Sequence, residues 1–171
     1  EAFVPLRDEV EFIDNYLDIE VVRFGRDKLR VIKELDPTSL DAMVPSMLLQ
    51  PLVENSIKHG ISSKVEGGSI YIRSRISESL MIIEVEDDGV GMGFATSPLS
   101  TSPLSTRLHA GRGIGMANVA ERLQVLYGDT ATMTVDSREG KGTLVRLRLP
   151  VLQDREGLPG ALYEERSSTR R

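Results

Sequence analysis

Residues 84–92, with the sequence EVEDDGVGM, constrain the fold of this 171-residue chain more than any other stretch. The largely apolar residues 80–86 predict a buried strand, and the aspartates and glycines that follow predict a sharp turn at its end. Asp87 then lies at the mouth of the strand, where a carboxylate can accept a hydrogen bond from an exocyclic amine such as that of adenine. Gly89 and Gly91 would allow a close approach of the backbone to a ligand and a positive φ. An ordinary turn without a ligand is the alternative interpretation.

Composition and charge limit the class of protein. The hydrophobic fraction of 40% and the charged fraction of 27% are ordinary for a globular domain with its own core. The formal net charge of −5 argues against a nucleic-acid-binding surface. The absence of Cys excludes disulfides and thiolate metal sites, and two His residues, His59 and His109, are too few for a multi-His metal site. No apolar run approaches the roughly 20 residues of a membrane span, and the first residues do not resemble a signal peptide.

The N-terminal third predicts a helix followed by a strand. Residues 6–24 repeat apolar side chains at spacings of three and four, which predicts an amphipathic helix. This helix is either docked on a domain or the end of a longer dimerisation helix. Residues 28–35 alternate apolar and polar side chains and predict a strand with one solvated face.

Residues 44–60, VPSMLLQPLVENSIKHG, predict two short helical pieces, because a proline inside one continuous helix would cost about 3 kcal/mol. Pro45 suits the first helical position of the first piece, and Pro51 suits the first turn of the second. Gly60 is the expected C-cap.

Asn55 and Lys58 lie three residues apart in the second piece, so both should face the same side. An amide oxygen and an ammonium group on one helix edge can address a magnesium-bound phosphate. A solvated helix face is the alternative.

Strands and a glycine-rich helix start make up the rest of the chain. Residues 69–76 and 80–86 predict a β-hairpin, and residues 131–137 and 143–149 predict two further alternating strands. Residues 93–112 contain TSPLS twice and little to bury, which predicts a mobile loop.

Gly111, Gly113 and Gly115 open a predicted helix, whose first N–H groups form a ready anion site. The last glycine of the dinucleotide fingerprint is missing and no strand precedes these glycines, so a Rossmann fold is a poor interpretation.

The motifs E-N-x-x-K-H, D-D-G-V-G-M, G-R-G-I-G-M and G-K-G-T follow one another in this order. Over residues 4–150 the chain closely resembles the ATP-binding domain of the GHKL superfamily, and two of its stretches resemble the LytS-type sensor histidine kinases. These stretches are LLQPLVENSIKHG and VPLRDEVEFIDNYLDIEVVRFG. The resemblance implies an α/β fold, a two-layer sandwich of the Bergerat type. Its mixed sheet would have helices on one face and a flexible ATP lid.

The resemblance also implies roles for single residues. Asn55 would bind magnesium, Lys58 would contact phosphate, and both would serve catalysis. His59 would line the nucleotide, and Asp87 would accept the adenine amino group. The remaining nucleotide-binding candidates are Gly89, Gly91, Met92, Gly111, Arg112, Gly113, Ile114, Gly115, Met116 and Thr143. Gly140 and Gly142 share the last motif with Thr143, and Arg107 is either a phosphate contact or a solvated lid charge.

The implied function is that of an ATP-dependent protein-histidine kinase. The domain would bind Mg-ATP and donate the γ-phosphoryl group to a histidine on an upstream domain, because neither His59 nor His109 suits the acceptor role. A nucleotide-binding regulatory module and a stand-alone ATPase are the alternatives. Pro51 occupies the position of the catalytic glutamate of gyrase-type members, which disfavours the ATPase, and Glu54 is not assigned as a base.

The expected domain organisation follows from the same resemblance. Residues 1–26 would be the end of a connecting or dimerisation helix, residues 27–150 the ATP-binding domain with a lid at about 93–112, and residues 151–171 a polar tail. Expected partners are ATP, the upstream histidine domain, a response-regulator receiver domain and a second copy in a homodimer, without nucleic acid. Because the sequence does not begin with Met, we expect an excised fragment. The resemblance implies that it is a cytoplasmic domain of a bacterial protein whose membrane anchor lies upstream.

Overall fold

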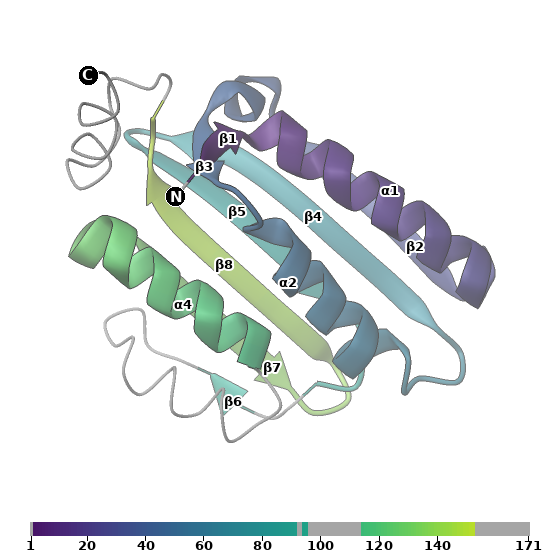
Figure 1. The fold of residues 1–171 in the computed structure, drawn as a ribbon. Coiled ribbons are helices and arrows are strands. Elements are labelled where there is room, and N and C mark those ends of the chain that lie inside the picture. The colour runs from purple at the N-terminus through teal and green to yellow at the C-terminus, as the bar shows by residue number, and fades with distance from the viewer. Residues whose placement is uncertain (1, 92–93, 96–113, 153–171) are drawn as a thin grey trace, which may run out of the picture.

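The computed structural model describes residues 2–91, 94–95 and 114–152. Within these residues, six strands form one sheet in the order β2-β4-β5-β8-β7-β6 (Figure 1). Strands β2 and β4 run parallel and the other neighbouring strands run antiparallel, which confirms the predicted mixed sheet. The strand bounds are β2 Leu29–Leu35, β4 Gly68–Ser77, β5 Leu80–Asp87, β6 Phe94–Ala95, β7 Thr132–Arg138 and β8 Gly142–Pro150.

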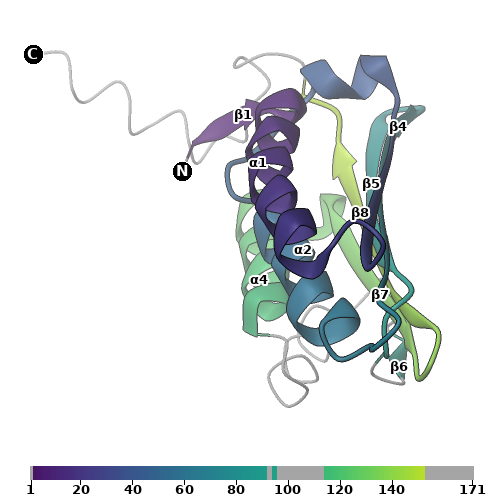
Figure 2. The same ribbon diagram turned by 90° about the vertical axis from the view of Figure 1, so that its right-hand side faces the viewer.

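Helices cover one face of this sheet. Figure 2 shows α1, α2 and α4 as one layer and the sheet as the other, which confirms the predicted two-layer sandwich. Two short strands, β1 and β3, pair antiparallel beside the helices. The bounds of these elements are β1 Phe3–Pro5, α1 Leu6–Phe24, β3 Met43–Pro45, α2 Leu49–Asn55 and α4 Ile114–Tyr127. Short 3-10 helices span Pro37–Asp41 and Gly128–Thr130, and a π-helical turn spans Ser56–Ile61.

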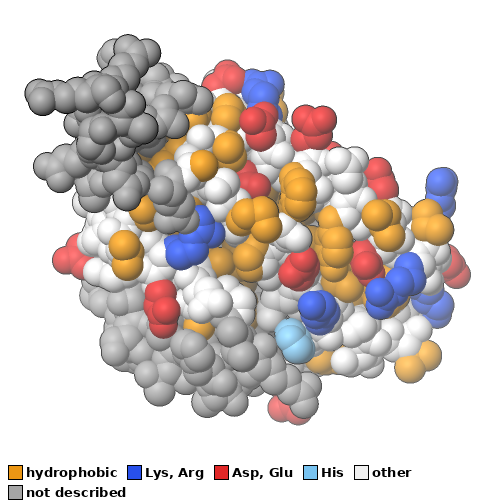
Figure 3. All heavy atoms as spheres, in the orientation of Figure 1, with side chains coloured by type: hydrophobic (Ala, Val, Ile, Leu, Met, Phe, Trp, Pro, Cys, Tyr) orange, Lys and Arg blue, Asp and Glu red, His pale blue; other side chains and the backbone are white. Residues whose placement is uncertain are grey.

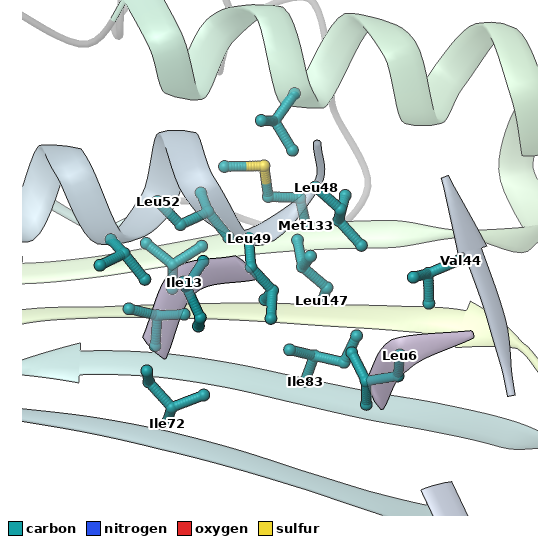
Figure 4. Close-up of a cluster of buried hydrophobic side chains, with 14 of the residues drawn as sticks. Leu6, Ile13, Val44, Leu48, Leu49, Leu52, Ile72, Ile83, Met133 and Leu147 are labelled. Atoms are coloured by element: carbon teal, nitrogen blue, oxygen red, sulfur yellow. The ribbon is translucent and has the colours of Figure 1, made fainter. Parts of the chain in front are cut away.

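The hydrophobic core lies between the two layers. Side chains alternate along a strand, so Ile83 and Val85 of β5 face the helices while their neighbours face the opposite side. Figure 4 shows Leu49 of α2 converging with Ile83 and with Leu147 of β8. These three side chains are buried, and burying such a side chain stabilises the fold by about 1.5–3 kcal/mol.

Helix α1 confirms the predicted amphipathic helix and is docked on the domain. Its stripe of Leu6, Val10, Ile13 and Leu17 is buried in the core. The other side leaves apolar side chains exposed, and Figure 3 shows hydrophobic groups among charged ones on this face. Within the described ranges no helix is both long and apolar enough to cross a membrane. The longer dimerisation helix stays a prediction.

Two details of the predicted helices at residues 44–60 are wrong. Pro45 ends strand β3 instead of beginning a helix, because its fixed φ also suits a short strand that pairs on one side only. Gly60 does not cap a helix, since the π-helical turn continues through it to Ile61. Pro51 is the third residue of α2, which confirms a helix that restarts near this proline.

Candidate functional site

Asp87 is a buried carboxylate at the end of strand β5. Its side chain is 3% exposed, and Oδ1 accepts a hydrogen bond of 2.9 Å from the Gly89 backbone N–H. Burial raises the pKa of Asp87 to about 6, and hydrogen bonds from the Gly89 N–H and the Ser56 hydroxyl act in the opposite direction. In the part of the chain that the structure describes, Asp87 forms no ion pair with a basic side chain. Asp87 thus accepts hydrogen bonds from the protein, but no cation among the described residues neutralises its charge.

Glycines bring two backbone segments against this carboxylate. A Cβ atom on Gly60 would lie 2.7 Å from Asp87 Oδ1, and one on Gly89 would lie 2.5 Å from the Gly60 Cα atom. The Val90 N–H also donates to the Gly60 carbonyl at 3.3 Å. The turn after β5 therefore packs backbone against backbone on the π-helical turn, and only glycine fits at either position.

Gly91 has the predicted positive φ, at 70°. The neighbour that requires a glycine there is the protein itself, because a Cβ atom would overlap the Arg138 carbonyl group. The Gly140 N–H donates to the Val90 carbonyl at 2.7 Å and ties this turn to the one between β7 and β8.

The two adjacent aspartates have different surroundings. Asp88 Oδ1 accepts a hydrogen bond of 2.7 Å from the Ser69 N–H, and the Asp88 carbonyl accepts one of 2.8 Å from Lys64 Nζ. Asp88 thus fastens the start of β4, whereas Asp87 faces the π-helical turn.

Asn55 lies on α2, and Lys58 and His59 lie on the π-helical turn that continues it. Asn55 is the last residue of α2 and half-buried, while Lys58 is exposed and His59 half-buried in the π-helical turn. The Ser62 N–H donates to the Ile57 carbonyl at 2.9 Å, so this hydrogen bond joins residues five apart, as in a π-helix, and not four apart, as in an α-helix. Such π-helical turns occur frequently at functional sites. The expectation that Asn55 and Lys58 share one face assumed regular α-helical spacing, which this turn interrupts.

The start of α4 lies beside the start of α2. A Cβ atom on Gly115 would lie 3.7 Å from the Pro51 Cβ, and Met116 is fully buried. Ile114 is the first helical residue of α4. The other predicted residues of this region lie outside the described residues: Met92, Arg107, His109, Gly111, Arg112 and Gly113.

Thr143 is adjacent to Asp87 across the sheet. The two residues are paired between β8 and β5, and Thr143 Oγ1 lies 2.7 Å from Ser137 Oγ. Gly142 has φ of 98°, and a Cβ atom there would overlap the Asp87 carbonyl group. The fold thus brings the G-K-G-T motif next to the D-D-G-V-G-M motif.

Ser56 is a site residue that sequence reasoning missed. It is 4% exposed and its hydroxyl bonds the Asp87 carboxylate. No local sequence pattern identifies Ser56, because its partner Asp87 lies on a strand far away in the sequence. The one hint in the sequence is that Ser56 directly follows Asn55.

Comparison with known proteins shows which family the sequence of this chain matches. Residues 41–153 match the family described as histidine kinase-, DNA gyrase B-, and HSP90-like ATPases. The chain is 34% identical over 151 residues to the sensor protein LytS of Oceanobacillus iheyensis, covering 88% of this chain and 26% of that protein. It is 32% identical to the sensor histidine kinase BtsS of Escherichia coli, covering 86% and 24%. The chain therefore spans about a quarter of the length of these relatives.

The fold is similar to that of a solved histidine kinase. The blue-light activated histidine kinase of Erythrobacter litoralis EL346 superposes with a TM-score of 0.58 at 21% sequence identity. The superposition covers 91% of this chain and 44% of that one, so the two share a fold.

Proposed function

Because the chain belongs to the family of histidine kinase-, DNA gyrase B-, and HSP90-like ATPases, we propose that it is the ATP-binding catalytic domain of a LytS-type sensor histidine kinase. It binds Mg-ATP and donates the γ-phosphoryl group to a histidine on an upstream dimerisation domain. The similarity to LytS and BtsS, two sensor proteins, supports this proposal.

The observation that carries the proposal is the buried Asp87 carboxylate, which has no cationic partner among the residues that the structure describes. A carboxylate whose pKa burial has raised gains more than an exposed one from a hydrogen-bond donor. The exocyclic amine of adenine is such a donor, and Asp87 would select adenine over a base with a carbonyl at that position. Binding requires ionised Asp87, so we expect nucleotide affinity to weaken as the pH falls below about 6.

Asn55 and Lys58 would serve the phosphates. Within the described ranges no group of three or more His, Cys, Asp or Glu side chains could hold a metal ion. Magnesium bound by nucleotide phosphates and one or two protein oxygens does not need such a group, so the Asn55 amide oxygen fits this role. The ion would neutralise charge on the transferred phosphoryl group.

The domain's own residues would act by positioning. Lys58 would offset phosphate charge, and the backbone N–H groups at the start of α4, which begins at Ile114, would hold phosphate oxygens. His59 would line the nucleotide, as would Gly89, Gly91 and Thr143 near Asp87. Phosphoryl transfer needs orientation and charge neutralisation more than covalent help from a protein group, so no catalytic glutamate is required at position 51.

In the complete protein we propose a homodimer, attached to the bacterial membrane through a segment outside this chain. The phosphoryl group would pass from the upstream histidine to the receiver domain of a response regulator. Neither His59 nor His109 is proposed as the acceptor.

Thermal unfolding with and without nucleotide tests the adenine site. A ligand at a hundredfold excess over its Kd stabilises the folded state by about 2.7 kcal/mol. We expect this stabilisation from ATP and ADP in the presence of magnesium, much less of it from GTP, and its loss in Asp87→Asn. Glu84→Gln, which removes a buried carboxylate from the opposite face of the same strand, is the matched control and should respond as the wild type does. An absent response at millimolar nucleotide, or an unchanged one in Asp87→Asn, would refute the proposal.

Transfer itself is tested with a longer chain that includes the upstream histidine domain. We expect acid-labile phosphate on that domain after incubation with γ-labelled ATP and magnesium, and none in the Asn55→Ala variant. Tight nucleotide binding without any transfer would instead indicate a regulatory module.

A further inference from the structure

Residues 46–48, which join β3 to α2, are held from both sides by side chains of other helices. Glu9 Oε1 of α1 accepts a hydrogen bond of 2.6 Å from the Leu48 N–H. Arg122 of α4 donates to the Ser46 carbonyl at 2.6 Å and to the Met47 carbonyl at 3.2 Å. Glu9 of α1 therefore binds N–H groups at the end of the segment, and Arg122 of α4 binds two of its carbonyl groups. The Ser46 N–H donates to the Ala2 carbonyl at 2.9 Å.

The backbone of this segment is unusual. Met47 has φ of 60°, in the left-handed region that residues other than glycine rarely adopt. Such a conformation persists where surrounding contacts hold it in place. The bonds from Glu9 and Arg122 are contacts of this kind.

Glu9 acts as the N-terminal cap of α2 in place of a local residue. The residue before α2, Leu48, has no side chain that can cap the helix. The Glu9 carboxylate is 4% exposed, and it bonds an N–H at the helix start, where a negative charge is favourable. Burial raises the pKa of Glu9, while the Leu48 N–H and the charge of Arg122 act in the opposite direction. Because the Glu9 carboxylate is buried and bonds the Leu48 N–H, it fixes the position of the start of α2.

Helix α2 connects the held segment directly to Asn55. The helix has seven residues, Leu49–Asn55, so it spans about 10 Å without an intervening loop. Its far end leads into the turn that contacts Asp87 through Gly60. A shift of residues 46–48 along the helix axis would therefore displace Asn55 relative to Asp87.

We propose that Glu9 and Arg122 are positioning residues, which fix Asn55 relative to Asp87 and so determine the magnesium-dependent part of nucleotide affinity without touching the nucleotide. The inference rests on the proposed function, in which Asn55 holds magnesium and Asp87 holds adenine. Through Glu9, a movement of α1 would shift α2 and with it Asn55, whereas the backbone of Asp87 is held in strand β5 by pairing with β4 and β8. The arrangement of α1, α2 and α4 side by side in Figure 1 matches this coupling.

The test is a calorimetric titration of ADP, with and without magnesium, into the wild type, Glu9→Ala and Glu9→Gln. We expect Glu9→Ala to weaken the affinity in magnesium roughly five- to tenfold and to change the affinity without magnesium less than twofold. Glu9→Gln should recover most of the loss, because its amide oxygen can still accept from the Leu48 N–H. Arg122→Gln should show the same selective loss as Glu9→Ala, and it covers the case in which Glu9→Ala does not fold.

Ile13→Val is the matched control for a purely structural effect. Ile13 is fully buried on α1, one helical turn from Glu9, and contacts the same core. The variant should lower the melting temperature and leave the ratio of the two affinities unchanged. Equal weakening of both affinities in Glu9→Ala, or no weakening, would overturn the inference alone. A wild type whose ADP affinity does not depend on magnesium would overturn the proposed metal site, and the inference with it.

Discussion

Two carboxyl groups of strand β5 are almost equally buried and have opposite electrostatic surroundings. Glu84 is 5% exposed and Asp87 is 3% exposed, on opposite faces of the sheet. Although burial opposes it, hydrogen bonds from Arg146 and Arg75 hold the pKa of Glu84 below its usual range. Asp87 has no such partners among the described residues, and burial raises its pKa to about 6.

The difference separates a carboxylate that serves the fold from one that is suited to a ligand. Glu84 joins strands β4, β5 and β8 through cations on its two neighbours, so its bonding capacity is used within the protein. Asp87 accepts hydrogen bonds from Gly89, Ser56 and Thr143, and these do not offset the effect of burial on its pKa. Burial alone therefore does not identify a site; the absence of a charge partner does.

The largest effect on stability should come from the charge of Asp87. Its folded-state pKa of about 6 lies above the ordinary 3.8, so the stability it contributes is present below pH 3.8 and is lost as the pH rises through about 6. Asp87→Asn should remove this loss, making the protein without nucleotide more stable than the wild type at pH 7.5 by up to about 3 kcal/mol.

Urea unfolding between pH 4 and pH 8 measures this difference. Glu84→Gln should keep the wild-type slope between pH 5 and pH 7, because the pKa of Glu84 is lowered rather than raised. Parallel pH profiles for the wild type and Asp87→Asn would show that the two carboxylates do not differ in this way.

Adding a methyl group at Gly89 should have the next largest effect. Its Cβ atom would overlap the Gly60 backbone, which cannot move as a side chain can, so Gly89→Ala should destabilise the protein by about 1–3 kcal/mol. Nucleotide affinity should fall as well, because Asp87 Oδ1 is bound by the Gly89 N–H. Denaturant unfolding measures the first quantity and titration with ADP the second. Gly89 is not among the glycines with a positive φ, so the contact alone causes its loss. Gly128→Ala is the reverse case, with a positive φ of 59° and no atom within reach of the Cβ, and it measures backbone strain without contact.

The smallest effect should come from Glu84. Arg75 is half-exposed and Arg146 is one-third exposed, so solvent screens their interaction with Glu84. Glu84→Gln should lower the free energy of unfolding by about 1 kcal/mol at pH 7, and the deficit should shrink as the pH falls below the ordinary range of glutamate. Nucleotide affinity should stay within twofold of the wild type. If Glu84→Gln lost as much nucleotide affinity as Asp87→Asn, the assignment of Glu84 to the fold and of Asp87 to the ligand would be wrong.

Much of the fold was predictable because its signals are local. The alternation in residues 28–35 and 69–76 and the apolar stripe of residues 6–24 specify elements that the structure confirms within one or two residues. The turn at Asp87 and Gly91 was predictable for the same reason. Pro45 and Gly60 were misassigned because each residue suits two local structures, and pairing with β1 or contact with Asp87 decided between them.

The sequence by itself determined the order of the elements, the buried faces of the strands and the candidacy of Asp87, since these depend on neighbouring residues in the chain. The tertiary structure alone decided which of the two adjacent aspartates faces the π-helical turn, and that Ser56 and Gly60 meet it there. It also brought Glu9 to the Leu48 N–H across 39 residues of chain. Such contacts depend on how helices pack on a sheet, and no periodic pattern in the sequence encodes them.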